Sequence, residues 1–304
     1  MKIKEVIQQF RDELNPLYSS EEIENFIFFS MHEYLGFSRR HLQLKSNQLL
    51  EKKETERFKI ILSELKNHKP IQYILGHTEF YGYKIRVNEQ VLIPRPETEE
   101  LVEFILQEIS GGGKEKDKLN LLDICTGSGC IAIALKKNLP GATVSALDIS
   151  DEALIVAKTN SILNHTLINF LQGDILHTHL KSILLPLEKG KAFDIIVSNP
   201  PYVLHSEKEK MSRNVVDYEP HSALFVKDED PLVFYKVIAD FALEHLSAEG
   251  KLYFEINEKM GSEVKKLLQE KEFGHVEIKK DMSGKDRIAV GKRQSTKADL
   301  SFGG

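Results

Sequence analysis

Hydrophobic side chains recur at helical spacing through residues 1 to about 70, and no strand pattern interrupts them. A Ser-Ser-Glu-Glu run at residues 19–22 is typical of a capped helix start, and Gly36 marks the end of that helix. A further helix is indicated between about residues 54 and 67. The apolar stripes comprise Ile23, Phe26, Ile27, Ser30 and Tyr34 in the first helix, and Phe58, Ile61, Leu62 and Leu65 in the second. The pattern predicts a small helical domain over residues 1–72, which packs against or recognises something else.

The hydrophobic period changes after residue 72. Residues 79–87 alternate and are rich in aromatic and β-branched side chains, so we interpret residues 73–95 as a β-hairpin linker. A helix is indicated from Pro96 through Ile109. The glycines and charges that follow, at residues 111–118, favour a flexible, solvated loop.

From Leu119 onward, short apolar runs alternate with helical patterns. The predicted strands are 119–124, 143–149, 168–172, 193–198 and 251–256, followed by a closing antiparallel pair at 275–280 and 287–291. The predicted helices run from the end of the first strand through Lys137, then over 151–163, 231–246 and 258–271. Alternating βα units imply a mostly parallel sheet covered by helices on both faces. We therefore expect an α/β, Rossmann-like domain of seven strands over residues 96–293, with a disordered tail at 294–304.

Composition narrows the class of protein. The 304 residues are 41% hydrophobic and 29% charged, which is ordinary for a globular chain. No run approaches the roughly 18 apolar residues of a membrane span, and the charged N-terminus lacks a signal-peptide core, so we expect a cytosolic protein without membrane association. A net charge of -5 argues against stable nucleic-acid binding. Cys125 and Cys130 are too few for a disulfide framework or a zinc cluster, and no metal is expected.

A glycine-rich turn joins the first strand of the α/β region to its helix. The segment Leu-Leu-Asp-Ile-Cys-Thr-Gly-Ser-Gly-Cys, residues 121–130, lies where ligands bind in a doubly wound sheet. Asp148 ends the next strand, where a carboxylate can accept hydrogen bonds from ribose hydroxyls. The glycine-rich turn and Asp148 together could bind a dinucleotide or S-adenosylmethionine. The alternative is a tight strand-to-helix turn that binds no ligand. Asp174 is an adenine-side contact or a helix cap. The candidate cofactor-binding residues are Cys125, Thr126, Gly127, Ser128, Gly129, Asp148, Asp174, Ile175 and Asn199.

The fourth strand ends in Asn199-Pro200-Pro201-Tyr202. Two prolines stiffen the bend and remove two amide donors. An amide or aromatic amine nitrogen is a poor nucleophile because its lone pair is delocalised. The Asn199 side-chain oxygen and the Pro200 carbonyl can accept its N–H bonds, and Tyr202 can stack on a planar group. The tetrapeptide therefore predicts methyl transfer to such a nitrogen; the alternative is a Pro-Pro turn capped by asparagine.

These motifs together resemble the release factor glutamine methyltransferases, the HemK-like branch of the class I S-adenosylmethionine-dependent enzymes. The matching segments are 70–76, 80–82, 93–99 (Ile-Pro-Arg-Pro-Glu-Thr-Glu), 122–129, 199–202 and 218–225. The chain departs from the family pattern at Glu97, where aspartate is more usual, and at Cys125, where glycine is commoner. Val226 and Lys227 replace the usual glycines of the last segment. The resemblance covers nearly the whole chain.

The resemblance implies methylation of the glutamine side-chain nitrogen in the Gly-Gly-Gln motif of class I peptide-chain release factors. Asn199 and Pro200 would orient that amide, and Pro201 and Tyr202 would wall the pocket. Arg95 and Glu99 would brace the nearby loop, or form a purely structural salt bridge, and the N-terminal helices would help to dock the release factor. One alternative is an adenine-N6 or guanine-N2 nucleic-acid methyltransferase, which uses the same tetrapeptide. Another is a non-catalytic module that only binds the cofactor.

Overall fold

The computed structural model describes residues 1–111, 118–177 and 192–294. Residues 112–117 of the predicted loop and 295–304 of the predicted tail lie outside this part. Contacts divide the chain into two units. The first comprises Met1–His77 with Met211–Tyr218, and the second comprises Thr78–Lys210 with Glu219–Gly304.

The N-terminal unit is helical, as its sequence pattern predicts. Its helices are α1 (Ile3–Leu14), α2 (Ser20–Leu35), α3 (Arg39–Leu44), α4 (Lys52–Lys66) and α5 (Ile71–Leu75). Ser19 caps α2 by accepting a hydrogen bond from the Glu22 amide, and Gly36 ends the helix at φ 65°. The predicted stripes of α2 and α4 meet in one buried cluster with α1, in which Phe10, Ile27 and Phe58 are at most 2% exposed.

A short distant segment also belongs to the N-terminal unit. Met211–Tyr218, which contains the helix α10 (Arg213–Val216), joins the helices of residues 1–77. The hydroxyl of Tyr218 donates to the carbonyl of Asn67 at 2.8 Å. The contact boundary therefore falls after His77 and includes this segment, whereas the sequence pattern predicts a helical domain over residues 1–72 followed by a linker over 73–95.

The second unit is built on a seven-stranded sheet in the described part of the chain, as predicted. Its strands are β3 (Asn120–Ile124), β4 (Thr143–Asp148), β5 (Asn169–Gln172), β6 (Phe193–Ser198), β9 (Leu246–Glu255), β10 (Gly274–Lys280) and β11 (Asp286–Lys292). Their spatial order is β10-β11-β9-β6-β3-β4-β5. The pairs from β9 to β5 are parallel, and β11 is antiparallel to both β9 and β10.

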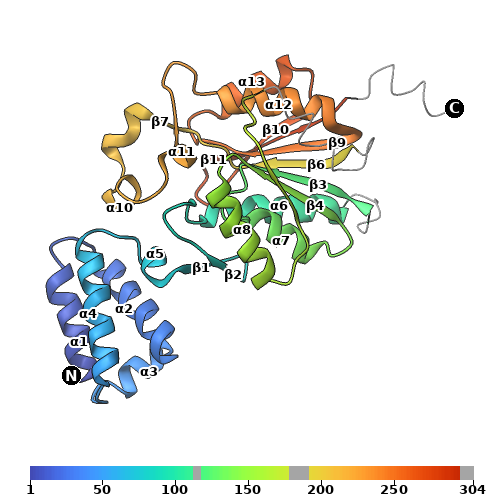
Figure 1. The fold of residues 1–304 in the computed structure, drawn as a ribbon. Helices are drawn as coiled ribbons and strands as arrows, with labels where there is room; N and C mark the ends of the chain where they lie inside the picture. Colours follow the sequence, from blue (N-terminus) through green and yellow to red (C-terminus); the bar gives the residue numbers. More distant parts are fainter. Residues whose placement is uncertain (112–117, 178–191, 295–304) are drawn as a thin grey trace. The chain divides into compact units, whose positions relative to one another are not determined.

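Helices cover both faces of this sheet (Figure 1). The helices α12 (Val233–His245) and α13 (Gly261–Glu270) lie on one face, and α6 (Pro96–Gly111), α7 (Cys130–Asn138) and α8 (Asp151–Leu163) lie on the other. Buried rings close the first face, where Tyr235 of α12 packs edge-on against Phe254 of β9 with centroids 5.1 Å apart. Burial on both sides explains why the strands read as continuous apolar runs.

The strand β9 begins earlier than the sequence pattern indicates. The helical pattern continues to Leu246, but the structure places Leu246 at the start of β9, paired with Phe193. The register with β6 then shifts, so that Ile195 pairs with Lys251. The extra residues of β9 at this shift, around Gly250, have no regular partners on β6. The first half of β9 therefore lacks the pattern of a strand.

The predicted hairpin forms from β1 (His77–Phe80) and β2 (Tyr83–Arg86). Tyr81 and Gly82 both have positive φ, 51° and 76°, as a two-residue turn of this hand requires. Within the second unit, the fully buried Asn160 of α8 fastens β2 to this helix: its Oδ1 accepts from the Arg86 amide, and its Nδ2 donates to the Arg86 carbonyl.

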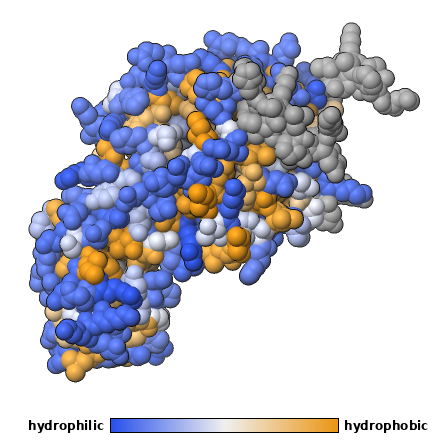
Figure 2. All heavy atoms as spheres, viewed as in Figure 1, coloured by the Kyte–Doolittle hydropathy of each residue, from blue (hydrophilic) through white to orange (hydrophobic). Residues whose placement is uncertain are grey.

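The remaining short elements follow the fourth parallel strand. They are β7 (Val203–Leu204), the 3-10 helix η2 (His205–Lys210), α11 (His221–Leu224) and β8 (Phe225–Val226), with β7 and β8 paired in parallel. Hydrophilic residues dominate the viewed face in Figure 2, with scattered hydrophobic patches. Among the described residues, every helix is too short or too polar to cross a membrane.

Candidate active site

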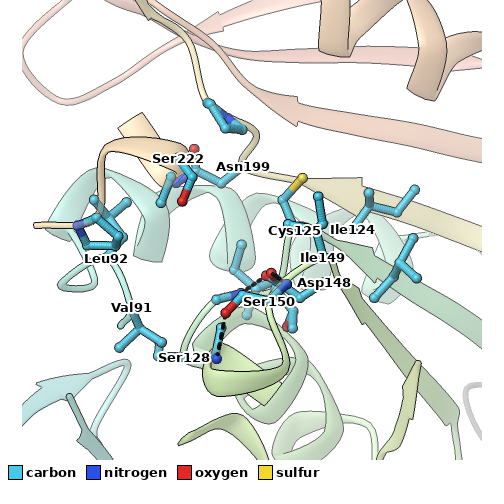
Figure 3. Close-up of a pocket in the computed structure, with 18 of the residues that line it drawn as sticks. Val91, Leu92, Ile124, Cys125, Ser128, Asp148, Ile149, Ser150, Asn199 and Ser222 are labelled. Atoms are coloured by element: carbon cyan, nitrogen blue, oxygen red, sulfur yellow. Dashed lines mark hydrogen bonds between the residues drawn. The ribbon is translucent and has the colours of Figure 1, made fainter. Parts of the chain in front are cut away.

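A pocket of about 290 Å³ opens at the carboxyl ends of β3, β4 and β6. The glycine turn after β3, the acid at the end of β4 and Asn199 after β6 all line it (Figure 3). In Figure 3, Asn199 and Cys125 lie on one side of the pocket, and Asp148, Ser150 and Ser128 lie on another side of it. Parallel strands bring these separate motifs to one edge of the sheet, where such folds bind ligands.

The glycine turn is held from inside the sheet by Asp123. Its Oδ2 accepts the Thr126 hydroxyl at 2.6 Å and the Ala132 amide at 3.3 Å. Burial raises the pKa of Asp123 to about 7, because no solvent stabilises its charge. Gly129 precedes α7 as its N-cap residue at φ 80°, and a Cβ there would lie 3.1 Å from the Ala157 Cβ. Gly129 supports the turn and is absent from the pocket lining.

Cys125 occupies the family's usual glycine position with φ 62°, a left-handed conformation that disfavours most side chains. It is half-buried and lines the pocket, while Cys130 is buried at the start of α7. Burial raises the pKa of both thiols. Both thiols are therefore neutral near pH 7 and act as small packing side chains.

Asp148 closes the turn from the next strand. Its Oδ2 accepts the Gly127 amide at 2.8 Å, and its Oδ1 accepts the Ser150 amide at 3.0 Å. Burial raises the pKa of Asp148, while these amides counter the rise. Each carboxylate oxygen has a second lone pair. The side chain can thus order the turn and still accept hydrogen bonds from a ligand's hydroxyls.

Asp174 lies at the pocket edge after β5, and the two residues that follow it form a turn. It lines the pocket beside the buried Ile175, and its Oδ1 also accepts the Leu176 amide at 2.9 Å. Its Oδ2 pairs with the His177 ring. Apolar Ile149 and Ile175 flank the acids Asp148 and Asp174 along the lining. A flat base attached to a ribose fits such a mixture of apolar walls and acceptors.

The predicted catalytic tetrapeptide is split between the pocket and the core. Asn199 and Pro201 line the pocket, whereas Pro200 and Tyr202 do not. Pro200 is buried, and the Tyr202 hydroxyl donates to Glu255 Oε1 at 3.0 Å. The amide nitrogen of Asn199 donates to the Thr98 hydroxyl oxygen at 3.2 Å. Tyr202 therefore fixes the bend through its hydroxyl in this structure.

Arg95 and Glu99 have separate partners. Arg95 lines the pocket and its guanidinium pairs with Glu219 at 2.6 Å. Glu99 accepts the Tyr81 amide at 2.9 Å, at the hairpin turn, and is absent from the lining. Of the two, Arg95 is the residue that braces the pocket wall.

Three buried polar residues near the site were not singled out by the sequence analysis. They are Thr98, Glu219 and Glu255, each at most 3% exposed. One signal was available for Glu255, since an acid that ends the apolar run Leu252–Phe254 must find a buried partner. Glu219 and Thr98 stood inside the motifs at 218–225 and 93–99, but nothing local indicated their burial.

The sheet order, with a reversed strand β11 inserted beside β9, and the pocket at the glycine turn define a class I methyltransferase. The methyltransferase domain of delta-N METTL16 shares the fold, with a TM-score of 0.50 and 18% identity, covering 71% of this chain and 90% of that one.

Comparison with known proteins identifies the particular family. Family models match residues 5–76 as the PrmC N-terminal domain and residues 103–218 as the Methyltransferase small domain. The release factor glutamine methyltransferase of Flavobacterium psychrophilum is 45% identical over 288 residues, covering 95% of this chain and 98% of that protein. The protein of the same name from Bacteroides thetaiotaomicron is 42% identical over 283 residues, covering 93% and 97%. The chain belongs to the release factor glutamine methyltransferase family.

Proposed function

We propose that this protein transfers a methyl group from S-adenosylmethionine to the side-chain amide nitrogen (N5) of the glutamine in the Gly-Gly-Gln motif of class I release factors. The observation that carries the proposal is that Asn199 and Pro201 line the same pocket as Gly127 and Asp148. Residues suited to bind a nucleoside and a residue suited to hold a planar nitrogen thus line one pocket in a member of this family.

The residues of the pocket fit the proposed methyl donor. Asp148 has lone pairs free for ribose hydroxyls, and Ile149, Asp174 and Ile175 can enclose an adenine. The turn at Thr126 and Gly127 would hold the amino-acid end. Bound there, S-adenosylmethionine supplies a methyl group on a sulfonium, whose sulfur takes the bonding electrons and leaves as the neutral thioether of S-adenosylhomocysteine.

The chain's own contribution is positioning. An amide nitrogen attacks only when its lone pair is turned away from the carbonyl, so its N–H groups must be held. The Asn199 side chain lines the pocket, and its oxygen would accept one N–H bond of the glutamine. The carbonyl of Pro200, which lies at the same bend but outside the pocket lining, would accept the other. Positive charge that develops on the nitrogen strengthens both hydrogen bonds, which favours the transition state over the ground state. The methylated nitrogen then sheds one proton to water.

A protein substrate needs a docking surface on the enzyme. The N-terminal unit, Met1–His77 with Met211–Tyr218, would dock the release factor. A release-factor substrate places the reaction in the cytosol. The net charge of -5 supports a protein substrate over a nucleic acid.

The test is to incubate the protein with labelled S-adenosylmethionine and, separately, a class I release factor or duplex DNA, and to map the methyl group by mass spectrometry. We expect label on the Gly-Gly-Gln glutamine, and a rate reduced at least about 100-fold in Asn199→Ala. Asn169→Ala, at an exposed position of β5, is the matched control and should retain the wild-type rate. Label on DNA alone would overturn the protein substrate and support the adenine or guanine alternative.

A further inference from the structure

A buried series of hydrogen bonds connects the end of β9 to the side chain of Asn199. Glu255 Oε2 accepts the Thr98 hydroxyl at 2.6 Å, and the Thr98 oxygen accepts the Asn199 Nδ2 at 3.2 Å. Thr98 is 2% exposed and Glu255 is 1% exposed. Water therefore does not compete for the bond between these two side chains, and their donors and acceptors must match each other.

The direction of these hydrogen bonds is determined by Glu255. An ionised carboxylate only accepts, so the single hydroxyl proton of Thr98 is committed to Glu255. Toward Asn199, the Thr98 oxygen can then act only as an acceptor. The amide of Asn199 must present its NH₂ group to Thr98, which turns its oxygen away. A flipped amide would bring two oxygens together with no proton between them.

The surroundings of Glu255 support its acceptor role. The hydroxyl of Tyr202 donates to its other oxygen at 3.0 Å. Burial raises the pKa of Glu255, while the hydroxyls of Thr98 and Tyr202 and the charge of Arg287 oppose that rise. Burial is the largest influence on this pKa, and the charge of Glu97 adds to it, whereas the two hydroxyl donors and the cation act in the opposite direction. Each carboxylate oxygen receives one hydroxyl, an arrangement in which the carboxylate acts as the acceptor. Asn199 and Tyr202, the first and last residues of the bend, are thus both tied to one carboxylate.

We infer that Glu255, acting through Thr98, is a positioning residue that keeps the carbonyl oxygen of Asn199 directed into the pocket. A side-chain amide is nearly symmetric in shape, so packing alone does not choose between its two orientations. Only the orientation with oxygen toward the pocket can accept an N–H from the substrate amide, whereas the opposite one would set donor against donor. The inference rests on the proposed function and explains how an asparagine can serve there as a dependable acceptor.

Thr98→Val tests this in the full-length enzyme, because it removes the hydroxyl and keeps the shape of the side chain. In single-turnover methyl transfer to a release factor, we expect the rate to fall by about 100-fold. The Kd for S-adenosylhomocysteine should stay within about twofold of the wild type, because Asp148 and the glycine turn are unchanged. Thr98→Ser should restore the rate. Thr159→Val, which removes a hydroxyl that donates to the Ile155 carbonyl at 2.9 Å on α8, is the matched control and should behave as wild type.

A double-variant comparison separates positioning from general damage. If Thr98 acts through Asn199, then Thr98→Val should cause no further loss in an Asn199→Ala background. Glu255→Gln, whose amide can donate to Thr98, should lower the transfer rate several-fold with the same unchanged Kd. Wild-type rates in Thr98→Val, fully additive losses, or a parallel loss of S-adenosylhomocysteine binding would overturn the inference.

A spectroscopic measurement keeps the inference testable without turnover. The side-chain NH₂ resonance of Asn199, assigned by its loss in Asn199→Ala, should exchange slowly with solvent in the wild type and in Thr98→Ser. It should exchange faster in Thr98→Val, and equal exchange in all three would contradict the inference. Failure of the proposed function appears differently, as an absence of wild-type label on the release factor with this exchange pattern intact.

Discussion

Arg95 and Glu219, which lie 124 residues apart in the chain, form an ion pair of 2.6 Å at the wall of the pocket. The Glu219 side chain is 1% exposed, and its second oxygen accepts the Ile93 amide at 3.2 Å. One carboxylate therefore fixes the extended segment that precedes α6 to the segment that follows α10. The pocket wall depends on both.

Removing the cation should destabilise the second unit strongly. Arg95→Ala leaves the buried Glu219 charge with only an amide donor, which costs about 3 kcal/mol or more. Lys266→Ala breaks the exposed pair of Lys266 with Glu270 and should cost less than about 1 kcal/mol. Urea unfolding of both variants checks the difference, and equal costs would show that Glu219 is solvated.

The acid at the end of β4 should control cofactor affinity. Asp148→Asn replaces one acceptor oxygen by an NH₂ group, so that the Gly127 amide or the Ser150 amide loses its partner. We expect the Kd for S-adenosylhomocysteine to rise at least about tenfold, which corresponds to roughly 1.4 kcal/mol. Asp151→Asn removes the same charge at an exposed position of α8 and should leave calorimetric binding unchanged.

The two glycines of the turn should respond differently to alanine. A Cβ at Gly127 meets no atom within 4 Å, so Gly127→Ala carries only the strain of φ 53°, about 1 kcal/mol. Gly129→Ala adds a contact of 3.1 Å with the Ala157 Cβ, in a fully buried place, and should cost about 1–3 kcal/mol more. Ala157→Gly should recover part of the second loss. Thermal unfolding of Gly127→Ala, Gly129→Ala and the double variant Gly129→Ala with Ala157→Gly measures these costs, and an equal cost for both single alanine variants would contradict the contact.

Asp123 should make stability depend on pH. Its folded-state pKa of about 7 exceeds the ordinary value of 3.8, and within the described residues its Oδ1 has no hydrogen-bond partner. Between these values the folded protein keeps a proton that the unfolded chain has lost, so the contribution to stability falls as pH rises from about 4 to about 7, and is constant above.

Asp123→Asn removes this dependence. The stability of the variant relative to the wild type should therefore increase across that pH interval, by at most about 4 kcal/mol. Denaturant unfolding at pH 5 and pH 8 measures the change. A difference that is the same at both pH values would show that Asp123 is ionised throughout.

Much of the fold was predictable because its signals are local. The strands β3 and β6 are apolar runs bounded by turns, and the helix α2 carries its own cap and end residues. The first half of β9 was missed because its pairing depends on a register shift against β6. The return of Met211–Tyr218 to the N-terminal unit is a contact between distant parts of the sequence, which hydrophobic periodicity does not report.

The candidate site also contains residues that local sequence signals predict and residues that they do not. The glycine turn, Asp148 and Asn199 each follow a recognisable strand, and parallel strands bring their ends together. Thr98 and Glu255 are 157 residues apart, and neither has a neighbour in sequence that indicates the other. Their roles follow from burial and from hydrogen-bond direction, which only the folded structure supplies.

The insertion of β11 between β9 and β10 sets the order in which the site can form during synthesis. Glu255 pairs in register with Ile288, and the amide of Ile256 donates to the carbonyl of Arg287 at 2.9 Å. Until residues 286–292 have left the ribosome, β9 has an unpaired edge on that side and the carboxylate that orients Asn199 is unsupported. Nascent chains that stop short of β11 would thus carry every motif of the site and still lack the strand that holds its central acid in place.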